Sequence, residues 1–69
     1  MFTTIGSVGT LRIAVSDAPS FGAYTVCLTE RDGTCTPLRA RGRSSREVLN
    51  RVVRYLSSDD ASVRWPFCD

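Results

Sequence analysis

The sequence predicts a small α+β domain, in which an antiparallel sheet of four to five strands carries one α-helix, about residues 45–57, on one face. Within the first 40 residues, short segments alternate apolar and polar residues, the period of a half-buried strand. One later segment has apolar residues at helical spacing. Because 69 residues suffice for one small core, residues 1–69 are expected to form a single domain.

Alternation is clearest in residues 11–15 (LRIAV) and 23–29 (AYTVCLT). The Asp32-Gly33 pair predicts the turn after the second segment, and residues 35–41 (CTPLRAR) form the return strand, with Leu38 and Ala40 facing the core. Proline cannot donate a ladder hydrogen bond, so Pro37 is expected at a sheet edge.

Two further strands are predicted at the ends of the chain. Residues 2–5 (FTTI) would pair with residues 11–15 through a turn at residues 6–9 (GSVG). Residues 63–67 (VRWPF) would form a short strand, or a strap that buries Trp65. The fifth strand of the sheet depends on this last segment.

The helix has a clear start signal, because Ser44-Ser45-Arg46-Glu47 fits a capping box. An apolar stripe wide enough to cover a sheet follows, made of Val48, Leu49, Val52, Val53, Tyr55 and Leu56. Glu47 and Arg51 are spaced as a favourable ion pair. The opposite, solvated side carries Arg46, Asn50 and Arg54.

Charge is distributed unevenly along the chain. All nine cationic residues are arginine, and the net charge is only +2. Residues 39–54 nevertheless hold six arginines against Glu47 alone, a net +5. The absence of histidine removes the commonest general base and the commonest metal ligand.

No arrangement of residues predicts catalysis or cofactor binding. The three cysteines form no CxxC pair, so we expect no metal site. Asp59-Asp60 reads as a solvated loop, and the GSVG segment is too short to cradle a phosphate. The chain also shows no secretory signal and no transmembrane stretch. We therefore expect a cytoplasmic, non-enzymatic protein without cofactor or metal.

Cys27 and Cys35 fall on one face of the predicted hairpin, eight residues apart, and are expected to be cross-strand neighbours. They form either a hairpin disulfide or, in a reducing cytosol, two thiols on an open sheet face. Arg12, Thr25, Arg39 and Arg41 are predicted on this same face, which the single helix leaves bare. Water, a partner or a second copy of the chain would cover it.

The segment LRARGRSSR, residues 38–46, is the candidate binding site, and its residues are Arg39, Arg41, Arg43 and Arg46, with Arg54 extending the track. These arginines could contact an acidic or polar protein surface, because the guanidinium group pairs bidentately with carboxylates. They could contact nucleic-acid phosphates, although no aromatic residue is interleaved to stack a base. They could also be a solvated face without a partner. We favour the protein partner over nucleic acid.

Residues 42–50 (GRSSREVLN), after a strand hairpin, resemble the Gly-x-Thr-x-x-Glu-Ala-x-x-Asn step of HicB-type antitoxins. That family also packs a small sheet on one helix, so the resemblance implies an antitoxin or a small nucleic-acid-binding domain using the Arg39–Arg54 face. The Pro-x-x-Pro-Gly-Cys-type segment of the family is absent from these residues, and we expect no DNA-binding domain after them.

A second resemblance is one of class. A small domain with arginine as its only cationic residue type and with one exposed charged face is similar to phage and mobile-element inhibitors of bacterial defence, particularly anti-CRISPR proteins. This resemblance implies a steric inhibitor in the bacterial host cytoplasm. It would dock on a CRISPR-Cas effector complex through the same five arginines and block DNA binding or nuclease recruitment.

Overall fold

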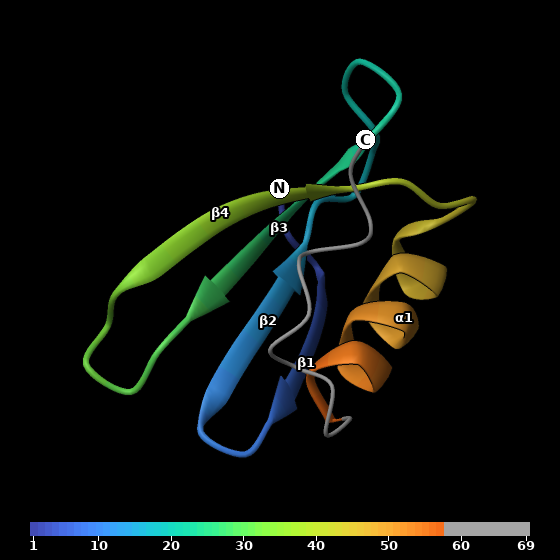
Figure 1. The fold of residues 1–69 in the computed structure, drawn as a ribbon. Helices are drawn as coiled ribbons and strands as arrows, with labels where there is room; N and C mark the ends of the chain where they lie inside the picture. Colours follow the sequence, from blue (N-terminus) through green and yellow to red (C-terminus); the bar gives the residue numbers. More distant parts are fainter. Residues whose placement is uncertain (58–69) are drawn as a thin grey trace.

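The fold is a four-stranded antiparallel sheet with one helix on one face, as a computed structural model describes for residues 1–57 (Figure 1). The elements are β1 (Thr4–Val8), β2 (Leu11–Val15), β3 (Tyr24–Thr29), β4 (Cys35–Ala40) and α1 (Ser45–Ser57). The strands follow one another in the order β1-β2-β3-β4. The predicted α+β class and helix are confirmed, whereas the segment 63–67 lies outside the described residues.

The first hairpin differs from the prediction in the place of its turn. Strand β1 continues through Gly6 to Val8, and the chain turns at Gly9-Thr10. Gly6 lies under α1, where an added Cβ would stand 2.9 Å from Leu49 Cδ1. This glycine therefore allows the helix to approach β1, and it does not mark a turn.

Strand register assigns each side chain to a face of the sheet. Ile13 pairs with Leu28, and Val26 pairs with Leu38, which places these apolar residues on the face that α1 covers. Among the strands of residues 1–57, β4 is an edge strand, because it pairs with β3 alone. Pro37 therefore lies at a sheet edge, as its missing N–H group predicts.

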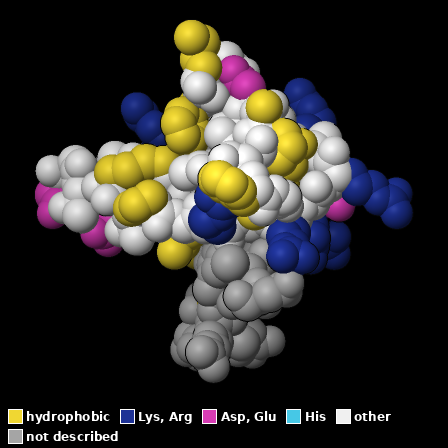
Figure 2. Space-filling model, turned by 90° about the horizontal axis from the view of Figure 1, so that it is seen from above, with side chains coloured by type: hydrophobic (Ala, Val, Ile, Leu, Met, Phe, Trp, Pro, Cys, Tyr) yellow, Lys and Arg dark blue, Asp and Glu magenta, His cyan; other side chains and the backbone are white. Residues whose placement is uncertain are grey.

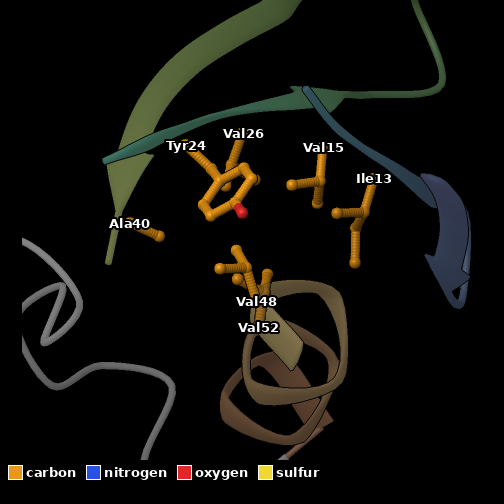
Figure 3. Packing of buried hydrophobic residues seen from close by; sticks show 7 residues of the cluster. All are labelled: Ile13, Val15, Tyr24, Val26, Ala40, Val48 and Val52. Atoms are coloured by element: carbon orange, nitrogen blue, oxygen red, sulfur yellow. The ribbon is translucent and has the colours of Figure 1, made fainter. Parts of the chain in front are cut away.

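The core lies between this face and α1 (Figure 3). Ile13, Val15 and Val26 from the sheet, together with Val52 from the helix, have no solvent-accessible surface. Val48, Tyr24 and Ala40 complete the buried cluster. Each fully buried aliphatic side chain stabilises the fold by about 1.5–3 kcal/mol relative to an exposed one. Six partly buried apolar residues pack around this cluster: Val8, Leu28, Leu38, Leu49, Val53 and Leu56.

The start of α1 is fixed by its cap and by β1. The Ser44 hydroxyl accepts a hydrogen bond from the Glu47 N–H group at 3.2 Å, as in the predicted capping box. The hydroxyls of Ser45 and Thr4 are 2.9 Å apart, which joins the first turn of the helix to β1. Glu47 in the first turn also has the charge that suits a helix N-terminus.

We predict that Val52→Ala lowers the free energy of unfolding by about 1–3 kcal/mol, because it leaves a cavity between helix and sheet. The control, Asn50→Ala on the exposed side of α1, should change it by less than about 0.5 kcal/mol. Chemical denaturation of both variants measures the difference. Equal losses would mean that α1 does not bury its Val52 side against the sheet.

Candidate functional site

The five arginines of the predicted binding site lie in two different places. Arg39 is half-buried in β4, on the sheet face opposite α1. Arg41 and Arg43 are exposed in the connection between β4 and α1, and Arg46 and Arg54 are exposed on α1. The one continuous track that the sequence predicts is therefore split, because a strand residue and the helix residues belong to opposite sides of the sheet.

Arg39 braces the connection between β2 and β3. Its Nη2 donates to the carbonyl oxygen of Ser20 and, at 3.4 Å, to that of Ala23. These two carbonyl groups flank the turn formed by residues 20–23. The sequence assigned Arg39 to partner binding, but the contacts show a structural role that charge patterning could not reveal.

Arg41 contributes its backbone to the attachment of the helix. The Nη1 atom of Arg51 donates to the Arg41 carbonyl oxygen at 3.2 Å. The sequence predicted an ion pair between Arg51 and Glu47, and the contact with the Arg41 carbonyl oxygen was not predicted. The contact ties the loop before α1 to the middle of the helix.

Arg43, Arg46 and Arg54 form the exposed part of the predicted site, which we call the basic surface. Within residues 1–57 none of the three guanidinium groups has a hydrogen-bond or ion-pair partner. Figure 2 shows most of the dark blue side chains on the side of the molecule that α1 occupies in Figure 1. The carboxylates of Glu30 and Asp32 belong to the distant turn between β3 and β4. The basic surface therefore lies away from these acidic groups.

Cys27 and Cys35 are bonded to each other, with an S–S distance of 2.06 Å and a Cα–Cα distance of 6.1 Å. Register pairs Cys27 with Pro37 and Cys35 with Thr29, so the disulfide is diagonal and does not join directly opposed residues. It links β3 to the edge strand β4 on the sheet face without the helix.

That sheet face has a row of small and apolar side chains that sequence alternation only partly identified. The register aligns Ile5, Ala14, Cys27 and Pro37 across the four strands. Ile5 is 53% exposed. The sequence predicted that the first strand ends at Ile5 and assigned this residue to neither face of the sheet. Among residues 1–57 no secondary-structure element packs over the row.

The connection between β2 and β3 is held at its base by polar contacts. The carboxylate of Asp17 accepts hydrogen bonds from the hydroxyl and the N–H group of Thr3. The backbone N–H group of Asp17 donates to the Met1 carbonyl oxygen at 2.9 Å. The Thr3 hydroxyl, followed by the Thr3 N–H group, lowers the pKa of Asp17 below its ordinary value of 3.8.

The same connection exposes an aromatic residue that the sequence did not single out. Phe21 is 97% exposed at the tip of the turn, and its φ of 52° lies in the left-handed region. A run of turn-forming residues, Asp17-Ala18-Pro19-Ser20, predicted a loop here, but no pattern indicated that its aromatic residue would point away from the core.

Residues 1–57 contain no group of three or more histidine, cysteine or carboxylate side chains arranged to hold a metal ion. The helix α1, in the same part of the chain, lacks the length and apolar character needed to cross a membrane. A shallow hollow lies at the end of the sheet near the β3–β4 turn and is lined by Thr10, Leu11, Glu30, Arg31 and Asp32.

No protein-family model, curated protein sequence or solved structure matches this chain. The resemblances to anti-CRISPR proteins and to HicB-type antitoxins therefore stay predictions from the sequence.

We predict that the Cys27–Cys35 disulfide raises the free energy of unfolding by about 2–3 kcal/mol, the loop-closure entropy expected for a bridge of this span. Denaturant unfolding with and without reductant, in a Cys68→Ser background, measures this effect. The Cys27→Ser/Cys35→Ser control should not respond to reductant. Identical unfolding of the bridged chain in both conditions would show that the disulfide contributes nothing.

We also predict that the Asp17 carboxyl titrates below 3.8 in an NMR pH series, and that Thr3→Val moves its pKa back toward that value. A lowered folded-state pKa means that the contact contributes stability at neutral pH and loses it as the pH falls through that pKa. Asp32, whose pKa is lowered by the Thr34 N–H group, is the internal control. A Thr3→Val variant with unchanged Asp17 titration would contradict the assignment.

Proposed function

We propose that this chain is a non-enzymatic binding protein, which docks on an acidic or polar surface of a larger protein through Arg43, Arg46 and Arg54. The observation that carries the proposal is the exposure of these three guanidinium groups, which have no partner among the described residues. Each presents a planar set of donors that matches a carboxylate. Arginine is enriched among the residues that dominate protein-protein binding energies.

The helix gives this surface a defined geometry. Arg46 and Arg54 are eight positions apart on α1, about two turns, so both lie on its outward side together with Asn50. The Ser44 cap and the contact between Arg51 and the Arg41 carbonyl oxygen hold the loop that carries Arg43. Because the backbone that carries these side chains is already ordered, binding does not have to order it, which favours recognition at a small surface.

The specific form of the proposal is an inhibitor of a bacterial defence complex of the CRISPR-Cas type, acting in the cytoplasm of the host cell. It rests on the general resemblance of this small chain, whose cationic residues are all arginine, to anti-CRISPR proteins. The mechanism would be steric, because a docked domain covers the surface that the complex needs for DNA or for a nuclease. Identifying the captured protein decides this form of the proposal.

We predict that Arg46→Glu/Arg54→Glu abolishes capture of a stoichiometric protein partner from nuclease-treated bacterial lysate. The matched control, Arg12→Glu/Arg31→Glu, makes the same charge change at two exposed arginines away from the helix and should retain the partner. Both variants should melt close to the parent protein, since none of these side chains is buried. Affinity capture and thermal unfolding provide the two measurements.

Two outcomes contradict the proposal. Equal loss of the partner in both variants would show that net charge matters and the basic surface does not. Recovery of nucleic acid alone would assign these arginines to phosphates. In that case affinity should fall about 10- to 40-fold between about 50 and about 200 mM salt for two or three phosphate contacts.

A further inference from the structure

The turn at residues 20–23 joins β2 to β3 and has an unusual residue at its tip. The N–H and C=O groups of Ser20 and Ala23 bond to one another at 2.8 and 3.2 Å, which closes a two-residue hairpin loop. Both loop residues have positive φ angles, 52° for Phe21 and 81° for Gly22. Such turns favour asparagine or aspartate followed by glycine, because a bulky side chain is strained at positive φ.

Phe21 contributes little to folding that could offset this strain. Its side chain is 97% exposed, so it buries almost no apolar surface within the chain. An exposed aromatic ring is also unfavourable in water. A residue that is strained in the backbone and unburied in the side chain points to a role outside the fold.

Hydrogen bonds at the base of the loop fix the position of the turn. Arg39 donates to the carbonyl oxygens of Ser20 and Ala23 from the adjacent edge strand. The Ser16 hydroxyl accepts from the Thr25 N–H group at 3.0 Å and donates to the Ala18 carbonyl oxygen at 3.1 Å. Asp17 binds Thr3 on the remaining side. The loop in Figure 1 therefore projects beyond the strands while its base is fixed by three separate parts of the chain.

We propose that Phe21 is an anchor residue that inserts its ring into an apolar pocket of a second protein. Because the turn is already ordered before binding, positioning the ring costs little further conformational entropy, as expected for an aromatic anchor. Met1, which is 93% exposed, is bonded to the base of the same loop through its carbonyl oxygen, so this end of the molecule offers a further apolar side chain.

The fixed geometry of the turn favours a protein pocket over a lipid or nucleic-acid surface, because a ring held in one orientation gains most from a cavity of matching shape. Charge does not distinguish these partners. The Asp17 carboxylate belongs to this loop, but the Arg39 guanidinium binds the same turn and the Met1 amino group acts on Asp17. The pocket should therefore combine an apolar floor for one phenyl ring with a polar rim.

This inference goes beyond the proposed function, since Phe21 and the basic surface lie on different elements and are tested by different substitutions. The first test replaces Phe21 with the photoreactive aromatic residue p-benzoylphenylalanine, and Asn50 in a matched control. After irradiation in nuclease-treated bacterial lysate, position 21 should form a protein adduct that position 50 does not. A tenfold excess of the unlabelled parent chain should suppress the adduct, whereas an equal excess of Phe21→Ala should not.

The adduct should map to an apolar segment of its partner. Absence of an adduct specific to position 21, or equal competition by the parent chain and Phe21→Ala, would overturn the proposal. Adducts between copies of this chain alone, or to lipid or nucleic acid alone, would also overturn it.

The second test measures the strain directly. Phe21→Asn, which suits this turn, should raise Tm by about 4 °C or more while removing the competition seen with the parent chain. Ile5→Ala, which truncates another exposed apolar side chain, should leave competition intact. A fall in Tm for Phe21→Asn would show that the residue serves the fold and would overturn the proposal.

Discussion

Packing of α1 against β1 and β2 is the contact on which the rest of the structure depends. Val48 and Val52 meet Ile13 and Val15 with almost no remaining solvent exposure. A four-stranded sheet in water is stable only if one of its faces is buried, and within the described residues α1 is the one helix that covers it. Within residues 1–57 one face of the sheet is therefore filled by a helix, and no helix or strand packs on the other face.

This constraint explains where polar and covalent reinforcement occurs. The helix gives β4 little support, because its main sheet contacts are with β1 and β2. Strand β4 is instead joined to β3 by backbone pairing and by the Cys27–Cys35 disulfide. Arg39 on the same strand extends this reinforcement to the β2–β3 connection. An edge strand with a proline is thus held by contacts that do not require a second helix.

Two surfaces of different chemistry result from this architecture. The basic surface is carried by the helix and by the loop that leads into it, and it presents three exposed guanidinium groups. The turn at residues 20–23 lies on a different connection and presents one apolar ring. Protein-protein binding commonly combines an aromatic anchor with arginine contacts, because the ring supplies buried area and the guanidinium groups supply orientation. The loop that leads into α1 is held by the contact between Arg51 and the Arg41 carbonyl oxygen. The turn at residues 20–23 is held by the backbone hydrogen bonds between Ser20 and Ala23.

The sequence by itself determined the local elements. Period-two alternation located β2, β3 and β4, the Asp32-Gly33 pair located their last turn, and the capping box with its apolar stripe located α1. These features depend on residues that are close in the sequence, so they can be predicted without the tertiary structure. The exposure of Arg46 and Arg54 on the helix could be predicted for the same reason.

Only the tertiary structure decided the features that depend on distant contacts. Gly6 is a strand residue because Leu49 packs over it, and Arg39 is a brace because the β2–β3 turn reaches its guanidinium group. Phe21 is exposed because hydrogen bonds from three parts of the chain fix its turn away from the core. Hydrophobicity and charge patterns indicate which face a residue can occupy. Contacts between residues far apart in the sequence, such as Arg39 and Ala23 at 16 positions, form only when the chain has folded.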